Sequence, residues 1–345
     1  MGGVELALTI DELHARRLRR NPLYRALKGG NAVLARRAHQ TGTAPSAASS
    51  VAVVTAGHRQ RELSPEAREI ADRVGALDWY HVLELPHGIR TPGRVDLRGE
   101  IGQYGLPPDM RGMRALDIAT FDGFLAFEME RRGAEVIATD LARGSQADWP
   151  ARMRGYLPPE HEVQLGGGFA LAKELLSSKV ERREVSVYDL SPETVGTFDF
   201  VLMSDLLQHL RDPARALEAA FSVVREDGCM VLAEVYEPAL ERYQRPFFEL
   251  RDNIRYTWSF PSTAALKRML AVAGFGSVEE IARPQLSHRG DVSAPKIVLK
   301  ARPSKDAVSS RTVRKGFAIG GVELQASIRR PARAAQAPQS QRPAS

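Results

Sequence analysis

Three aspartates, each at the end of an apolar run, are the residues of this sequence best suited to bind a ligand. Asp117 is followed by a tight turn that opens a helix near Gly123, and such a turn presents backbone N–H groups and a helix N-terminus to a bound group. Asp140 follows at about twenty residues from this turn, where a carboxylate accepts both hydroxyls of a ribose. Asp189 ends the next run, where it is placed to accept the adenine amino group while Tyr188 or Leu190 touches the ring. The spacing therefore predicts an adenosine site.

Each acid also has an ordinary structural interpretation. Asp117 fits a strand-end turn, Asp140 a helix cap, and Asp189 a cap for the segment that follows Ser191 and Pro192. The adenosine site would be absent only if all three aspartates had these structural roles. Ligand binding is therefore the favoured interpretation.

The acids need a scaffold of alternating strands and helices. Between about Ser64 and Pro303, short apolar runs alternate with segments of helical period, which is typical of a parallel sheet covered by helices. Seven runs predict strands, at residues 115–118, 135–139, 184–187, 198–203, 230–235, 277–281 and 296–300. Parallel strands end at one edge of the sheet, where open α/β sheets bind ligands. We therefore expect an α/β fold: a Rossmann-like, doubly wound, seven-stranded, mostly parallel sheet with helices on both faces and an N-terminal helical lid.

The boundaries of two helices can also be predicted. One is expected to begin after the capping residue Asp212, with Pro213 in its first turn, and to end at Gly228. The other follows Ser262 and ends at Gly274.

The two ends of the chain differ from this middle part. The chain has 345 residues, 43% of them hydrophobic, and a formal net charge of +6 that is concentrated at its ends. Residues 41–50 and about 332–345 are too poor in large apolar side chains to offset chain entropy by burial. We predict a basic, partly disordered extension and linker at 1–63, a folded domain at 64–303 and a basic, largely disordered tail at 304–345. The ends are interpreted as solvated tails, with nucleic-acid or membrane-surface arms as the alternative.

Several classes of protein are disfavoured by the sequence. No apolar run approaches the roughly 18 to 20 residues of a membrane-spanning helix, and the start lacks a signal-peptide pattern, so we expect a cytoplasmic protein that does not bind membranes. Cys229, the single cysteine, lies in an apolar run and is expected to be a buried thiol. The eight histidines form no helical pair at ligand spacing, so no metal is expected.

The turn after the first predicted strand resembles a known signature. Residues 116–123, Leu-Asp-Ile-Ala-Thr-Phe-Asp-Gly, are similar to the Asp-x-Gly-x-Gly-x-Gly signature of class I S-adenosylmethionine (SAM)-dependent methyltransferases, and Asp140 and Asp189 match their ribose and adenine acids. Ala119 and Phe121 replace the first two glycines, so the backbone should approach the methionine part less closely. The resemblance implies SAM as the cofactor, and a cofactor site made of Asp117, Ala119, Thr120, Asp122, Gly123, Asp140, Leu141, Tyr188, Asp189 and Ser204.

A narrower resemblance extends from about residue 78 to residue 301. Its signatures are Trp79-Tyr80-His81 and residues 85–88, 91–93, 121–128, 167–173 and 206–213. Together they are similar to the family related to the tRNA wobble-uridine (5-methoxyuridine or 5-carboxymethoxyuridine) methyltransferases, many of whose relatives act on unidentified acceptors. Its carboxymethyl-transferring members use a tyrosine and an arginine to hold the carboxylate of carboxy-SAM, where this chain has Gln208 and Ile297. An amide and an alkyl group cannot replace that charge-assisted pairing, so SAM itself is expected and a tRNA substrate is less strongly implied.

The methyl acceptor is expected near the end of the fourth predicted strand. His209 follows this strand and is the candidate general base, because histidine titrates near neutral pH. Its alternative is a histidine that fixes the loop through a backbone carbonyl, and Asp205 has the same two interpretations, base or loop cap. The expected acceptor site consists of Trp79, Tyr80, His81, Gln208, Arg251, Arg255, Tyr256 and Trp258.

These aromatic and arginine residues also have a second interpretation. Trp79 and Tyr80 fit core packing as well as a lid over the cofactor. The arginines and aromatic rings of residues 237–260 can stack on a flat acceptor such as a nucleobase, or form an ordinary hydrophobic cap.

The favoured function is an enzyme, a methyltransferase that moves a methyl group from SAM to an oxygen or nitrogen of a small molecule or an RNA. The transfer is a direct displacement, so positioning supplies much of the rate and no enzymatic nucleophile is needed. A tRNA wobble-uridine methyl or carboxymethyl transferase is the first alternative, and a non-catalytic SAM- or RNA-binding protein the second. A nicotinamide-dependent oxidoreductase is disfavoured, because the turn offers only Gly123 of a Gly-x-Gly-x-x-Gly loop. Nothing in the sequence predicts the oligomeric state.

Overall fold

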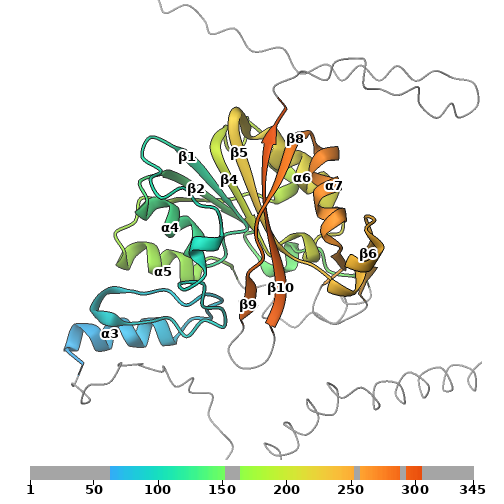
Figure 1. Cartoon of the computed structure of the whole chain (residues 1–345). Helices are drawn as coiled ribbons and strands as arrows, with labels where there is room; N and C mark the ends of the chain where they lie inside the picture. The colour runs from blue at the N-terminus through green and yellow to red at the C-terminus, as the bar shows by residue number, and fades with distance from the viewer. Residues whose placement is uncertain (1–62, 152–163, 252–256, 288–292, 305–345) are drawn as a thin grey trace, which may run out of the picture. The chain divides into compact units, whose positions relative to one another are not determined.

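The structure, a computed structural model, describes residues 63–151, 164–251, 257–287 and 293–304 (Figure 1). The predicted linker at 41–50 lies outside the described residues, as do almost all of the N-terminal extension and of the C-terminal tail. Arg255 and Tyr256 of the expected acceptor site also lie outside them.

A single twisted sheet forms the centre of the described domain (Figure 1). In spatial order its strands are β3 (Glu181–Glu184), β2 (Glu135–Asp140), β1 (Arg114–Ile118), β4 (Phe198–Ser204), β5 (Val224–Val235), β10 (Ser293–Pro303) and β8 (Phe275–Ala282). The strands from β3 to β5 are parallel, whereas β10 runs antiparallel to both β5 and β8. A short strand, β9 (Gln285–Ser287), also pairs with β10. The predicted seven-stranded, mostly parallel Rossmann-like sheet is confirmed.

Helices cover both faces of the sheet, as predicted. The helices α3 (Pro65–Gly75), α4 (Phe124–Arg131) and α5 (Gly167–Leu175) share one hydrophobic core, and α6 (Pro213–Ser222) and α7 (Thr263–Ala273) share the other. Neighbouring strand residues alternate between these cores: Ala115 packs with α3 to α5, and Leu116 packs with α6 and α7. The N-terminal helix α3 is part of the first core through Ile70 and Val74.

Several predicted boundaries are wrong. β5 begins at Val224 instead of residue 230, and β10 covers Ser293–Pro303 instead of 296–300. The third strand was expected at 184–187, but β3 covers Glu181–Glu184 and residues Val187–Asp189 form a short 3-10 helix, η6. Because β3 is an edge strand with polar side chains, its position is set by pairing with β2 rather than by an apolar run. The helix expected to reach Gly228 ends at Ser222, since Val224 already pairs with Phe198 in the sheet.

The caps of the other predicted helix are confirmed. Ser262 caps α7, accepting a hydrogen bond from the backbone N–H of Ala265 at 3.1 Å. Gly274 ends the helix with φ of 119°. Cys229 is buried, as expected.

Residues 237–251 and 257–261 form a separate layer after β5. They contain the 3-10 helix η8 (Pro238–Tyr243) and an antiparallel pair of strands, β6 (Phe248–Leu250) and β7 (Ser259–Pro261). Tyr243, Phe247, Phe248 and Leu250 are exposed on this layer. Because these side chains are exposed, the layer is only in part the hydrophobic cap that one interpretation of the sequence predicted.

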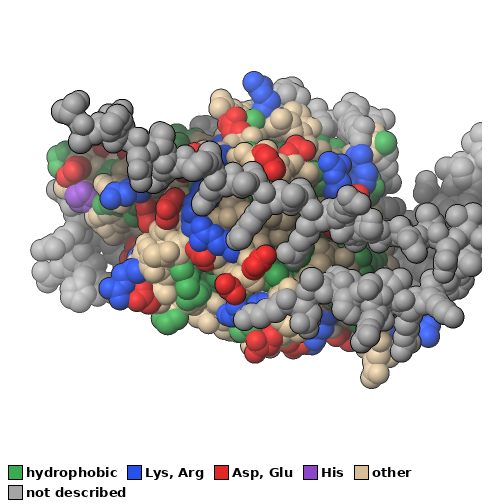
Figure 2. Space-filling view, turned by 90° about the horizontal axis from the view of Figure 1, so that it is seen from above, with side chains coloured by type: hydrophobic (Ala, Val, Ile, Leu, Met, Phe, Trp, Pro, Cys, Tyr) green, Lys and Arg blue, Asp and Glu red, His purple; other side chains and the backbone are tan. Residues whose placement is uncertain are grey.

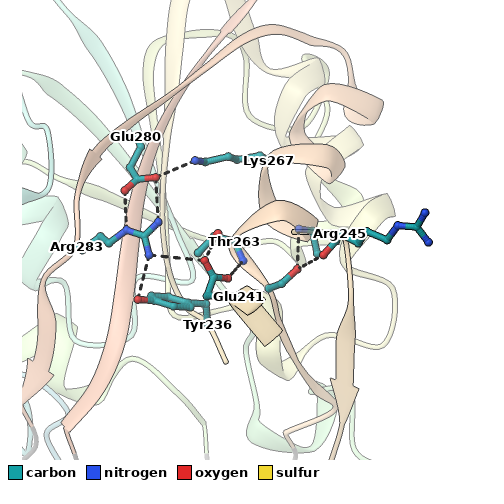
Figure 3. Close-up of polar contacts among 9 residues, drawn as sticks. Tyr236, Glu241, Arg245, Thr263, Lys267, Glu280 and Arg283 are labelled. Atoms are coloured by element: carbon teal, nitrogen blue, oxygen red, sulfur yellow. Dashed lines mark hydrogen bonds and ion pairs between the residues drawn. The ribbon is translucent and has the colours of Figure 1, made fainter. Parts of the chain in front are cut away.

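A polar cluster attaches this layer to α7 and β8 (Figure 3). The Glu241 carboxylate of η8 accepts hydrogen bonds from the backbone N–H and the hydroxyl of Thr263, at 2.8 and 2.7 Å. Arg283 bonds Glu280 at 2.6 Å and the hydroxyl of Tyr236 at 3.2 Å, and Lys267 bonds Glu280 at 2.8 Å. The cluster joins segments that lie far apart in the sequence.

Glu280 should make the stability of this region depend on pH. Hydrogen bonds from Arg283 and Lys267 lower the pKa of Glu280 from 4.5 to about 2. A carboxyl whose pKa is lowered on folding contributes stability that is present above its unfolded pKa and is lost as the pH falls through its folded pKa. Glu280→Gln should therefore reduce the loss of unfolding free energy between about pH 4.5 and pH 2, by less than about 1 kcal/mol because the pair is partly exposed.

Urea denaturation at a series of pH values measures this effect. The matched control is Glu279→Gln, which changes the exposed neighbour of Glu280. If both variants show the same pH dependence, Glu280 is not responsible.

Candidate active site

A cavity of about 400 Å³ lies at the C-terminal ends of the parallel strands. Its size is that of a small-molecule site. Its wall comes from the segments that follow β1, β2, β3 and β4, together with one earlier piece of chain. The residues are Tyr80, His81, 117–121, Leu125, 139–141, 144, 146–149, Leu165, 185–188, 204–206 and 209–210. This is the edge at which open α/β sheets bind ligands.

Asp117 forms the centre of this wall, at the end of β1. It is buried, and the Thr120 hydroxyl donates a hydrogen bond to its carboxylate at 2.7 Å. Burial raises the pKa of Asp117 to about 7, against the opposing effect of the Thr120 hydrogen bond. Thr120 also lines the cavity, so the structure brings both predicted cofactor residues to its wall.

The turn after β1 has a left-handed backbone, which is typical of glycine, at two positions that are not glycine. Ala119 and Phe121, which replace the first two glycines of the signature, have φ of 59° and 51°. This left-handed conformation costs a residue with a Cβ about 1 to 2 kcal/mol. The replacements therefore change the side chains at these positions but keep the left-handed backbone.

Asp140 lines the cavity beside this turn. One carboxylate oxygen accepts the backbone N–H of Phe121 and the other that of Leu141, both at 2.7 Å. Burial raises the pKa of Asp140, although these backbone hydrogen bonds act in the opposite direction. Each carboxylate oxygen has two lone pairs, so each retains one for a ligand hydroxyl. Leu141, another predicted cofactor residue, is also in the wall.

Asp189 lies outside the cavity wall. It is exposed, in η6, whereas Ser186, Val187 and Tyr188 of the same segment line the cavity. The sequence pattern placed Asp189 at the end of a strand, but residues Val187–Asp189 form the short helix η6 instead. Tyr188 is therefore the predicted adenine-site residue that reaches the cavity.

Asp122 and Gly123, which we predicted to be cofactor residues, make structural contacts. Asp122 is buried and does not line the cavity. Gly123, with φ of 91°, precedes α4, and a Cβ there would come within 2.5 Å of Phe127 and 2.7 Å of Phe169. The glycine is required for close packing of these helices.

Asp122 holds the segment that carries Tyr80 and His81. One of its oxygens accepts the backbone N–H groups of Tyr80 and His81, at 2.9 and 2.7 Å, and the other bonds the His81 Nδ1 at 2.5 Å. Tyr80 and His81 line the cavity. Trp79 does not: it is buried in the core and its Nε1 donates to the Val74 carbonyl at 2.9 Å.

The loop after β4 brings Ser204, Asp205 and His209 to the cavity wall. Glu234 supports this loop by accepting the backbone N–H groups of Leu206 and Leu207, at 2.8 and 3.0 Å. Burial, with a smaller effect of the nearby Asp205, raises the pKa of Glu234 to about 8.

A network at the rim connects the remaining elements. Tyr188 donates its hydroxyl to Asp148 at 2.5 Å, and the Trp258 Nε1 donates to the Asp148 carbonyl at 2.6 Å. Burial and this hydrogen bond raise the pKa of Tyr188 to about 12. The backbone N–H of Trp258 also donates to the Gln208 carbonyl at 2.8 Å. Gln208 and Trp258 thus support the rim but are not part of the cavity wall.

Arg251 also lies outside the cavity wall. Its guanidinium bonds Glu237 at 2.7 Å and Glu249 at 3.0 Å, and it lies over the ring of Phe260 at 4.8 Å. Two carboxylates of the same layer therefore compensate its charge.

A buried lysine that the sequence reasoning missed lies behind the β4 loop. The Lys296 side chain, on β10, is fully buried, and its Nζ bonds Asp205 at 2.6 Å, the Tyr104 hydroxyl at 2.8 Å and Ser204 at 3.3 Å. Burial alone would lower the pKa of Lys296, but Asp205 and Tyr104 raise it above its usual value. Ile297 in the last strand led us to expect no cation or phenol near the transfer site. Lys296 precedes Ile297 and points to the opposite face of the sheet, where it is the cation beside Asp205. The available signal was a lysine that directly precedes the apolar residues 297–299.

A sequence model of the methyltransferase domain matches residues 95–280, which is more than half of the chain. The chain belongs to this methyltransferase-domain family. The prediction of a methyltransferase is confirmed at the level of the family. Every helix that the structure describes falls short of the length and apolarity needed to span a bilayer.

The chain is similar to ubiquinone biosynthesis O-methyltransferases. That of Paracidovorax citrulli (strain AAC00-1) is 30% identical over 131 residues, which are 38% of this chain and 47% of the relative. That of Xanthomonas oryzae pv. oryzae (strain PXO99A) is 32% identical over 125 residues, 36% of this chain and 44% of the relative. The chain thus spans less than half the length of these relatives. Among solved structures, the N-terminal domain of EvdMO1 with SAH bound is 20% identical, with a TM-score of 0.46, over 69% of this chain and 97% of that one.

Proposed function

We propose that this protein is a SAM-dependent methyltransferase that transfers a methyl group to an oxygen or nitrogen atom of its acceptor. The observation that carries the proposal is the cavity at the strand ends, where Asp117 and Asp140 lie together in a chain of the methyltransferase-domain family. In this proposal Asp140 holds the ribose and the turn after β1 holds the methionine part. The adenine ring lies near Tyr188. A cytoplasmic location, expected from the sequence, is part of the proposal.

The chemistry asks the protein mainly to align two ligands. SAM supplies an activated methyl group, and the protein excludes water and places the acceptor atom in line with it. His209, the general base predicted from the sequence, lines the cavity, and His81 is the second histidine in the wall. Asp122 fixes His81 through its Nδ1, which leaves the other ring nitrogen available for a ligand.

A small molecule is the acceptor that we favour. The similar relatives are named as O-methyltransferases of ubiquinone biosynthesis. In the view of Figure 2, the acidic and basic side chains of the described residues are interspersed and form no single basic stripe of the kind that tracks a nucleic-acid backbone.

A tRNA wobble uridine, implied by the narrower sequence resemblance, is the second candidate acceptor. The exposed rings of Tyr243, Phe247 and Phe248 favour it, because aromatic side chains stack on unpaired bases. Arg242 lies over the Tyr243 ring at 4.6 Å and adds a cation to this surface. Methyl-labelled SAM supplied to separate RNA and small-molecule fractions distinguishes the two acceptors.

Asp140→Ala tests the cofactor site. The variant removes a charged hydrogen-bond acceptor, so the affinity for S-adenosylhomocysteine (SAH) should fall by about tenfold to a hundredfold, which corresponds to about 1.5 to 3 kcal/mol. Isothermal titration calorimetry measures it. Asp189→Ala is the matched control, because Asp189 is exposed outside the cavity wall, and it should retain the wild-type affinity.

An unchanged affinity in Asp140→Ala would remove Asp140 from the cofactor site. A wild-type protein that binds neither SAM nor SAH would overturn the proposed function itself.

A further inference from the structure

Asp205 is the least satisfied acid of the cavity wall. Its side chain is 11% exposed, and its Oδ2 accepts hydrogen bonds from Lys296 at 2.6 Å and Ser204 at 3.3 Å. The Oδ1 is buried and has no hydrogen-bond partner among the described residues. Asp205 therefore offers one fixed carboxylate oxygen and one uncommitted oxygen.

The protein holds Asp205 in this state against two costs. The uncommitted oxygen is desolvated without compensation, and the residue has φ of 54°, a conformation that residues with a Cβ rarely adopt. Its backbone N–H donates to the Ala233 carbonyl at 3.0 Å, and Tyr104 holds Lys296 from behind. Such costs, when the surroundings enforce them, are typical of functional sites.

The order of the strands places Asp205 away from the ribose side. In the sheet β1 lies between β2 and β4, so Asp140 and Asp205 stand on opposite sides of Asp117. Adenosine over the ends of β2 and β3 leaves the β4 end of the cavity for the reacting groups. Asp205 is thus located where an acceptor must approach.

We propose that Asp205 is a catalytic residue whose Oδ1 binds the O–H or N–H of the methyl acceptor and takes its proton. This inference rests on the proposed function. The acceptor's lone pair forms the new bond to the methyl carbon, the carbon–sulfur bond breaks with its electrons left on sulfur, and the acceptor's proton passes to Asp205. The acceptor is consequently an alcohol, a phenol or an amine that carries hydrogen. Lys296 and Tyr104 are positioning residues, which orient Asp205 through its other oxygen.

The surroundings of Asp205 favour it over His209 as the group that takes the acceptor's proton. The Lys296 Nζ is fixed on the Oδ2 of Asp205 at 2.6 Å, and only a hydrogen-bond donor can satisfy the free Oδ1. A methyl acceptor that is itself a carboxylate, or that carries no O–H or N–H group, would leave the Asp205 Oδ1 without a hydrogen-bond partner. His209 lines the same end of the cavity and is the rival base.

Sinefungin tests this assignment without knowledge of the acceptor. In this SAM analogue a carbon that bears an amine replaces the sulfur that bears the methyl group, so a cationic hydrogen-bond donor lies where the methyl group would project. Wild-type protein should bind sinefungin about tenfold more tightly than SAH, by calorimetry. In Asp205→Asn this preference should disappear, while the affinity for SAH stays within about twofold of wild type.

Three further variants make the result decisive. Asp227→Asn, which changes an exposed aspartate at the opposite end of the sheet, should keep the preference. Lys296→Met removes the cation that competes for Asp205, so it should raise the preference for the cationic amine without changing SAH binding. The double variant Asp205→Asn, Lys296→Met removes both charges together, so it keeps the test possible if a single variant does not fold.

Two results would overturn the assignment. One is a sinefungin preference that survives in Asp205→Asn or disappears only in His209→Gln. The other is a wild-type protein that binds SAH without preferring sinefungin. Failure of the proposed function is distinct, because no cofactor analogue would then bind.

Discussion

Replacement of Lys296 by methionine should lower the free energy of unfolding by about 3 to 5 kcal/mol. Lys296 is fully buried, and its Nζ compensates Asp205 at 2.6 Å and bonds the Tyr104 hydroxyl at 2.8 Å. Methionine fills similar space but leaves the Asp205 carboxylate without its cation. The cost is large because an uncompensated charge in a low dielectric has lost its water and gained nothing in return. Urea denaturation at pH 7 measures the loss.

The controls separate the charge from the change of volume. Lys300→Met makes the same substitution on the same strand at a partly exposed position and should change stability by no more than about 0.5 kcal/mol. The double variant Asp205→Asn, Lys296→Met should recover much of the loss, since no unpaired charge remains buried. Equal losses at positions 296 and 300 would show that the buried pair does not matter for stability.

Asp122→Ala should have a second large effect, again about 3 to 5 kcal/mol on unfolding, because several buried donors lose their acceptor and each costs about 1 to 3 kcal/mol. Asp122 accepts the backbone N–H groups of Tyr80 and His81 and the His81 Nδ1. Because these residues line the cavity, the affinity for SAH should fall as well. Chemical denaturation and calorimetry on the same preparation measure both effects.

Two control variants test this explanation. Asp122→Asn keeps an oxygen that can accept the backbone N–H groups, so it should lose clearly less stability than Asp122→Ala. Asp109→Ala changes an exposed aspartate that bonds only Arg111 among the described residues, and no measurable change is expected. If Asp122→Ala behaves like Asp109→Ala, the Tyr80–His81 segment is held by other contacts.

Local pattern was sufficient for most of the sheet. The strands β1, β2 and β4 appear within one residue of their predicted ends, because each is a run of apolar residues buried on both faces. Ser262 and Gly274 bound α7 as predicted, since capping depends on residues only a few positions apart. The pattern failed at β3, where an edge strand has polar side chains and only its partner defines it.

The candidate site was predictable in part for the same reason. Asp117 and Asp140 end strands whose position was clear, so their meeting at one edge followed from the order of the fold. Asp189 and Asp122 differ from expectation because a short helix and a distant backbone segment, neither visible in local spacing, determine where their side chains lie.

The sequence by itself thus determined the α/β class, the sheet edge that carries the site, and the family. Only the tertiary structure decided that Lys296, Tyr104 and Asp205 form one buried cluster. Lys296 lies 192 positions after Tyr104 and 91 after Asp205, and no periodicity connects them. The physical reason is that a buried charge is stable only where its partners converge in space, and this convergence arises when β10 pairs with β5 beside the end of β4.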